Sequence, residues 1–166
     1  MSDTEGASKN ELLMAACKQD NLDMLEEVLS SDATSFDINH TDGLGNSALH
    51  YAARHGSTGC LEILLYYDGI DVNKINRLEG DTPLHKAAEF REPDTALEMV
   101  QILIRGGASA KIRNKLKQTA GDVAPGDTHS EVKKFLEEVV LASQFDLRDI
   151  AVEDDSDSDG VPSDDE

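Results

Sequence analysis

The sequence predicts an all-α fold in which helix pairs, joined by short turns, stack into a solenoid. A similar segment recurs along the chain, with 35 residues from Leu49 to Leu84 and 37 residues from Thr82 to Thr119. Such a period is typical of stacked helix-pair repeats. The composition is 39% hydrophobic but only 4% aromatic, without Trp, so small aliphatic side chains must build the core. A chain of 166 residues corresponds to one domain of ordinary size.

Each repeat is expected to contain two helices. Ser47 and Thr82 can cap the start of a first helix, and Pro83 stands at the first helical position, where its missing N–H costs nothing. A leucine and an Ala-Ala pair follow, small enough for a neighbouring helix to approach closely. Gly69 and Gly106 can end a second helix. That second helix carries aliphatic residues at helical spacing: Leu61, Leu64 and Leu65 in one repeat, and Val100, Leu103 and Ile104 in the next.

Two segments carry a family resemblance, because residues 81–88 read DTPLHKAA and residues 45–53 read GNSALHYAA. Both resemble the T-P-L-H-x-A-A motif of the ankyrin-repeat family. The resemblance implies a solenoid with short β-hairpin turns, which binds proteins and has no catalytic activity. It covers four units: an N-terminal capping unit (10–41), two repeats (42–76 and 77–113) and a C-terminal capping unit (114–142).

The last units depart from the motif. Gly121 replaces the core leucine, Asp122 replaces the histidine, and residues 125–126, Pro-Gly, shorten the first helix. The third unit has four extra residues near 90–94, which are either a longer connection or a docking site. Phe90 favours a docking site if its side chain is exposed. Residues 143–152 are expected to form a lid over the last helix or a docking motif.

The charge is concentrated at the two ends. The chain has 34 acidic and 15 basic residues, a net charge of −19, of which residues 1–41 carry −7 and residues 143–166 carry −9. This excess disfavours nucleic acid and anionic membranes, although less firmly at the basic turns. No apolar run approaches the roughly 20 residues that span a bilayer. Residues 153–166, with 8 acids and no base, predict a disordered tail, and residues 1–9 a flexible N-terminus.

No catalytic, cofactor or metal site is expected. His50 and His85 occupy the family's motif position, which implies that they tie a helix start to the adjacent turn. Cys17 and Cys60 are predicted to be buried small hydrophobic residues rather than a disulfide. The remaining histidines lack metal-ligand spacing and a nearby nucleophile motif: His40, His55 and His129.

In the family, the turn tips and the exposed side of the inner helices line a concave groove. Carried over position by position, this implies partner-binding residues: Leu44, Asn46, Tyr51, Arg54, His55, Arg77, Leu78, Lys86, Glu89, Phe90, Lys115 and Lys117. Tyr51 beside Arg54 is the strongest single candidate, since both types are frequent anchors in interfaces. The later turns are basic and the first unit is acidic, which suits a partner with basic and acidic parts. The alternatives are an ordinary solvated face or a loosely bound acidic tail.

We therefore expect a soluble, monomeric, non-catalytic protein of the cytoplasm, and also of the nucleus, that binds a protein partner. One hypothesis is an adaptor or escort whose acidic ends hold a basic client, such as a ribosomal protein or histone. The alternative is a regulatory inhibitor that occludes a kinase or transcription factor and does not need the tails. Ser156 and Ser163, each with acids one and three residues later, resemble casein-kinase-type acceptor sites, where phosphate would add about −1.5 to −2.

Overall fold

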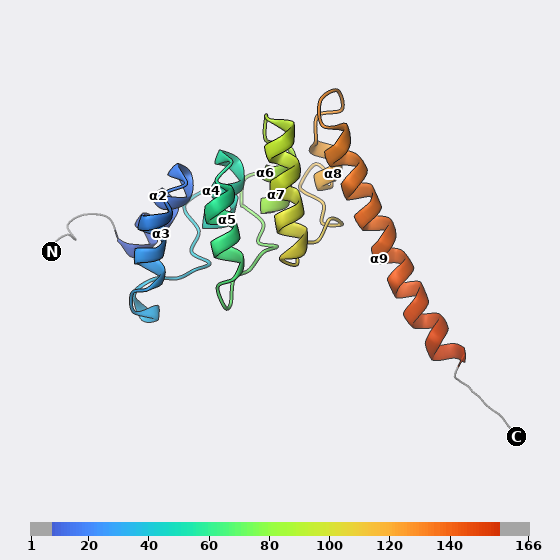
Figure 1. Ribbon diagram of the computed structural model, residues 1–166, viewed down its shortest axis with the longest axis horizontal. Helices are drawn as coiled ribbons and strands as arrows, with labels where there is room; N and C mark the ends of the chain where they lie inside the picture. The colour runs from blue at the N-terminus through green and yellow to red at the C-terminus, as the bar shows by residue number, and fades with distance from the viewer. Residues whose placement is uncertain (1–7, 157–166) are drawn as a thin grey trace, which may run out of the picture.

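The computed structural model describes residues 8–156, with side chains for residues 8–145. Helix pairs stand side by side in chain order and form an elongated stack (Figure 1). Within residues 8–156 the secondary structure is helical, and the only β contact is an antiparallel bridge between Thr41 and Ser47. The predicted all-α solenoid is confirmed. None of the described helices combines the length and apolar character that crossing a bilayer requires.

Each unit contributes one inner and one outer helix, in the order that the sequence predicts. A short 3-10 helix, η1 (Ala33–Ser35), follows the first pair. The inner helices are α2 (Lys9–Gln19), α4 (Ala48–His55), α6 (Pro83–Ala88) and α8 (Ala120–Val123), and the outer helices are α3 (Leu22–Leu29), α5 (Thr58–Leu65), α7 (Pro93–Arg105) and α9 (Ser130–Ser156).

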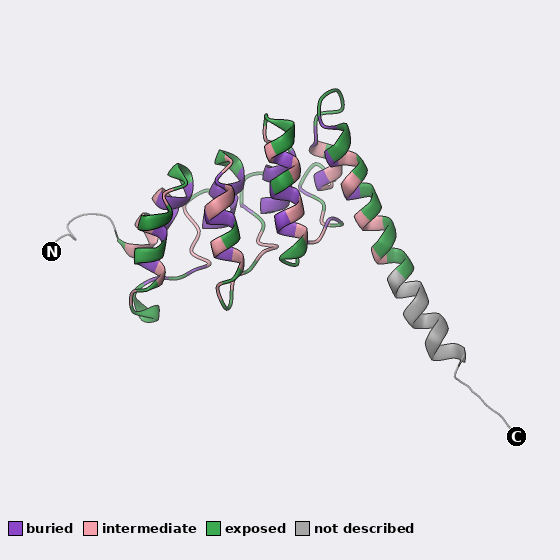
Figure 2. Ribbon diagram, viewed as in Figure 1, coloured by how far each residue is buried: buried purple, intermediate pink, exposed green. Residues whose placement is uncertain are grey.

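The core lies between the inner and outer helices, and the loops at the ends of the helices are mostly exposed (Figure 2). Inner helices pack against one another through alanine pairs that are fully buried, such as Ala52 with Ala53 and Ala87 with Ala88. Outer helices bury larger aliphatic side chains, including Leu64. Small side chains on one layer and large ones on the other allow the units to stack closely.

The turns between units are tight hairpins, and a backbone hydrogen bond joins the first and last residues of each. The N–H of Asp42 donates to the carbonyl of Asn46 at 3.0 Å, and the hairpins at residues 76–81 and 114–118 are closed in the same way at 2.9 Å. Consecutive hairpins are also bonded to each other, because the N–H of Arg77 donates to the carbonyl of Leu44 at 2.8 Å. The predicted short turns are therefore present and joined into a continuous edge, but within residues 8–156 their only β character is the bridge between Thr41 and Ser47.

The two cysteines are buried and free, as predicted. Cys17 lies on α2 and Cys60 on α5. A hydrogen bond with Cys60 and burial raise the pKa of the Cys17 thiol. Both therefore act as small core side chains that join the first two units.

Residues 143–152 do not form a separate lid over the last helix. Helix α9 continues without a break from Ser130 to Ser156, so it includes residues 143–152 and the first part of the acidic tail. It extends away from the stack (Figure 1). Phe145, on this helix, is exposed. Ser156 is the last residue of the helix, whereas Ser163 lies outside the described residues, as does most of the N-terminal segment. A docking role for residues 143–152 stays a prediction.

Replacing Gly45 with Ala should destabilise the stack by about 1–3 kcal/mol. Gly45 has φ +83°, and an added Cβ would lie 2.5 Å from the backbone nitrogen of Arg77 in the next hairpin. Gly43→Ala is the matched control in the same turn, since nothing lies within 4 Å of its added Cβ. Urea denaturation measures both free energies of unfolding. Equal values for the two variants would contradict the tight approach of the hairpins.

Candidate protein-binding surface

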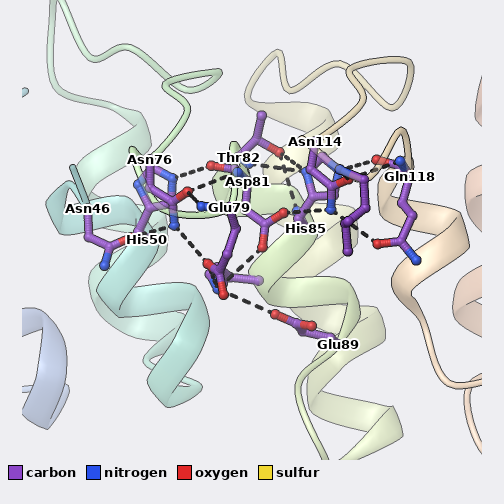
Figure 3. A network of polar contacts seen from close by, with 12 residues as sticks. Asn46, His50, Asn76, Glu79, Asp81, Thr82, His85, Glu89, Asn114 and Gln118 are labelled. Carbon is purple, nitrogen blue, oxygen red and sulfur yellow. Dashed lines mark hydrogen bonds and ion pairs between the residues drawn. The ribbon is translucent and has the colours of Figure 1, made fainter. Parts of the chain in front are cut away.

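Two buried histidines connect the inner helices α4 and α6 to the hairpin of the following unit (Figure 3). Nδ1 of His50 accepts a hydrogen bond from the backbone at its own helix start, and Nε2 donates to the carbonyl of Asp81 at 2.8 Å. His85 repeats this arrangement, with the carbonyl of Gln118 as acceptor at 2.9 Å. Burial lowers the pKa of His50, which favours the neutral ring that both bonds require. The structural role implied for these histidines fits this geometry.

Buried polar side chains also join the hairpins to one another. Asn76 donates to the side-chain oxygen of Asn46 at 3.0 Å, and Asn114 donates to the carboxylate of Asp81 at 2.9 Å (Figure 3). Asn46 was expected to face a partner, but only 4% of it is exposed. The expectation of exposure is wrong there, because the neighbouring hairpin covers this amide.

Lys86 is the second residue whose expected exposure is wrong, since only 7% of it is exposed. Its ammonium lies 2.6 Å from the carboxylate of Glu79, 3.3 Å from that of Asp81 and 3.6 Å from that of Glu89. Burial acts to lower the pKa of Lys86, but the hydrogen bond to Glu79 and the neighbouring carboxylates outweigh it and raise that pKa. Lys86 therefore neutralises a cluster of acids within the stack.

The acids of this cluster are not equivalent. The hydrogen bond from Lys86 lowers the pKa of Glu79. Burial raises the pKa of Glu89, and the like charges of Asp81 and Glu79 add to this effect despite the nearby ammonium. One cation thus serves three carboxylates, and that of Glu89 lies farthest from it.

Tyr51, the strongest candidate from the sequence, is also largely covered, with 9% exposed. Its hydroxyl donates to the carboxylate of Asp42, and the ammonium of Lys18 lies 4.5 Å from the centre of its ring. The expected exposure is wrong because Lys18, from the preceding unit, covers the ring. Arg54 and His55 on the same helix are exposed, as expected.

Phe90 is half-buried rather than exposed, and it lies over the turn that follows α4. An added Cβ on Gly56 would come 2.6 Å from the ring of Phe90, so the two are in close contact. The carbonyl of Phe90 accepts a hydrogen bond from Nε2 of His129 at 2.6 Å. The inserted residues are thus held by units on both sides. Phe90 contributes to a shallow hollow of about 530 Å³ on the inner-helix face, lined also by Arg54, Glu79, Lys86, Glu89 and Arg91.

The hairpin tips carry the clearest exposed apolar residues among the predicted positions. Leu44, Leu78 and Leu116 occupy the same place in three successive hairpins, two residues after the residue that closes each turn. They are 49%, 64% and 77% exposed, respectively. We call these three leucines the hairpin row. The predicted basic residues beside them are exposed as well: Arg77, Lys115 and Lys117.

A second exposed apolar surface was not predicted from the sequence. Tyr66 and Tyr67 follow α5, and both contribute with Phe36 to a hollow of about 670 Å³. The available signal was the adjacent pair Tyr66 and Tyr67 before Asp68, in a chain that has few aromatic residues, whereas Phe36 joins them only in the fold. We call Phe36, Tyr66 and Tyr67 the aromatic edge. Within residues 8–145, no group of His, Cys, Asp and Glu side chains is arranged to hold a metal ion.

These features define a helical repeat protein whose hairpins and inner helices form one continuous face. The family model for ankyrin repeats (3 copies) matches residues 2–76, and the model for a single ankyrin repeat matches residues 79–115. Ankyrin repeat-containing protein YGL242C of Saccharomyces cerevisiae is 36% identical over 148 residues, covering 84% of this chain and 82% of that protein. The chain belongs to the ankyrin-repeat family, which confirms the resemblance.

Other relatives share the repeat array within much longer proteins. BCL-6 corepressor-like protein 1 of Homo sapiens is 34% identical over 125 residues, which are 75% of this chain and 6% of that protein. Protein phosphatase 1 regulatory subunit 12A of Mus musculus is 37% identical over 128 residues, 75% of this chain and 11% of that protein. This chain therefore spans only a small part of either relative.

Lys86→Met should destabilise the protein by about 1–3 kcal/mol, a range that allows for solvent screening of the half-exposed Glu79 and Glu89. The change leaves three carboxylates without their shared cation. Adding Glu89→Gln to the variant should restore part of the loss, and lowering the pH into the carboxylate range should narrow the gap to the original chain. Lys117→Met, at an exposed position, is the control. Urea denaturation at several pH values measures these effects. If the difference in unfolding free energy between the original chain and Lys86→Met did not depend on pH, Lys86 would not act by neutralising these acids.

Proposed function

We propose that this ankyrin-repeat interaction module, which we take to be non-catalytic, docks its protein partner along the hairpin row. Three exposed leucines at one repeated position are the observation that carries the proposal. Isolated exposed leucines are common on proteins, whereas a row on adjoining structural units offers a continuous apolar strip. The hydrogen bonds between hairpins fix the spacing of these leucines, so little conformational entropy is lost when a partner covers them.

The charges along the hairpins favour an acidic partner segment with apolar side chains. Asp42 turns its carboxylate inward, where it accepts hydrogen bonds from the backbone N–H groups of Leu44 and Asn46, both at 3.0 Å. Asp81 is buried, and Glu79 is bonded to Lys86. The acids of the hairpins are thus paired within the stack. Beside Leu78 and Leu116 the exposed bases Arg77, Lys115 and Lys117 outnumber the one half-exposed acid, Glu79, which is already bonded to Lys86. This excess supports steering of an acidic segment toward the row.

We propose that the module acts as an escort, because in that role the acidic ends would hold the basic part of a client. The hairpin row does not suit a basic client such as a ribosomal protein or histone, so the ends, or another surface, must hold its basic part. The alternative, a regulatory inhibitor of a kinase or transcription factor, needs only the hairpin row. A relative that is named as a regulatory subunit of protein phosphatase 1 supports a regulatory role, although its name specifies neither a kinase nor a transcription factor.

The combined substitution Leu78→Ala and Leu116→Ala should weaken partner capture by about tenfold, because each leucine would bury apolar area in the complex. Both side chains are exposed, so the fold should tolerate the change. Tagged full-length chains, original and variant, are compared by quantitative mass spectrometry of the proteins that they retain. Leu22→Ala, at an exposed position on α3, is the control. A partner retained equally by all three chains would exclude the hairpin row as its docking surface.

Replacing the acids of residues 153–166 with their amides distinguishes the escort from the inhibitor. For an escort, affinity for the captured partner and its dependence on salt should both fall, because the lost attraction is electrostatic and screened by ions. For an inhibitor, neither quantity should change appreciably. The affinity is measured by calorimetry over a series of salt concentrations. The escort role fails if the partners that depend on the hairpin row are all acidic or neutral.

A further inference from the structure

The aromatic edge presents one exposed ring, that of Tyr66, supported by the buried Phe36 and the partly buried Tyr67. Tyr66, which follows the last residue of α5, is 88% exposed. It lines the hollow of about 670 Å³ with Phe36 and Tyr67, and it also lines a second hollow of about 290 Å³ beside Ile102. A tyrosine placed between two hollows offers an aromatic face to a partner from either side.

The two loops that form the aromatic edge are tied together. Asn39, in the loop after α3, donates to the carbonyl of Gly69 at 2.8 Å and accepts from the N–H of Asp71 at 2.7 Å. The rings of Phe36 and Tyr67 pack with their centres 5.8 Å apart at an interplanar angle of 60°. The edge is therefore an ordered platform, along the side of the stack where the loops after α3 and α5 turn back (Figure 1).

The surroundings of the aromatic edge are negative. Asp37 and Asp68 line the larger hollow, and Glu62 lines the smaller one together with a single base, Arg105. Between residues 19 and 73 the sequence has 10 acidic residues and one Lys or Arg, which is Arg54. An aromatic face bordered by carboxylates complements a positively charged side chain in two ways, through the ring and through the acid.

We propose that the aromatic edge binds a basic, arginine-bearing segment of a partner protein. A guanidinium can stack on the ring of Tyr66 while its N–H groups donate to the carboxylate of Asp68 or Asp37. Lysine carries the same charge but lacks the flat fork, so it should bind more weakly. The proposal does not depend on the hairpin row, although it supplies a place for the basic client of an escort.

The test uses the full chain and a short fluorescein-labelled peptide of alternating arginine and glycine, measured by fluorescence anisotropy. Tyr66→Ala should weaken binding by about five- to tenfold, whereas Tyr66→Phe, which keeps the ring, should bind as the original chain does. The pair Asp37→Asn and Asp68→Asn should weaken binding and reduce its dependence on salt. A matched lysine peptide should bind less tightly, and Leu78→Ala, on the hairpin row, should leave binding unchanged.

Several results would overturn the proposal. Equal binding by the original chain and Tyr66→Ala would mean that the aromatic edge is not the site. Loss of binding only when the acids of residues 153–166 are neutralised would assign the peptide to the tail. Sedimentation that shows self-association lost in Tyr66→Ala would make a second copy of this chain the occupant. If the hairpin-row variants did not affect partner capture, only the proposed docking along the hairpin row would fail. The arginine-peptide test would still stand, because it uses a different ligand and different variants.

Discussion

The hydrogen bond from a buried histidine to the next hairpin is the interaction on which the rest of the stack depends. His50 and His85 each use one ring nitrogen at their own helix start and the other across the boundary between units. A repeat contacts only its neighbours, so its stability comes from such boundaries as much as from its own helices. Because both ring nitrogens are committed, the ring fixes the distance and the orientation of consecutive units.

This commitment of polar groups to the interior determines what remains on the surface. The amides of Asn76 and Asn114 and the carboxylate of Asp81 are all engaged between hairpins. Apart from Glu79, which is bonded to Lys86, the exposed side chains that are left at the turn tips are leucines and bases. In an ordinary globular domain the polar side chains of a turn face water, whereas here several of them hold the turns together. The hairpin row can therefore be exposed to solvent while the backbone that carries it stays ordered.

The sequence was sufficient for the fold, because the repeat period, the helix caps and the alanine pairs are local signals. It was also sufficient for Leu78 and Arg54, whose exposure follows from their place in the repeat. It failed for Tyr51 and Asn46, because residues of a neighbouring unit or hairpin cover these side chains. It also failed for Lys86, whose ammonium turns toward three acids of its own unit. Lys18 covers Tyr51, a contact between residues 33 positions apart that no motif encodes. The aromatic edge was missed for a related reason, since it joins loops of two different units.

The distribution of charge along the stack constrains how any partner could lie on it. Residues 74–117 contain 9 basic and 6 acidic residues, whereas the aromatic edge lies in the acid-rich part that precedes them. A solenoid does not fold back on itself, so these two regions cannot neutralise each other across a shared core as they might in a globular domain. A partner with a basic and an acidic segment would have its direction set by the stack, because reversing it would place like charges together at both ends. For a partner of this kind, electrostatics over the length of the array would set the orientation, and the few apolar side chains that it covers would set the affinity.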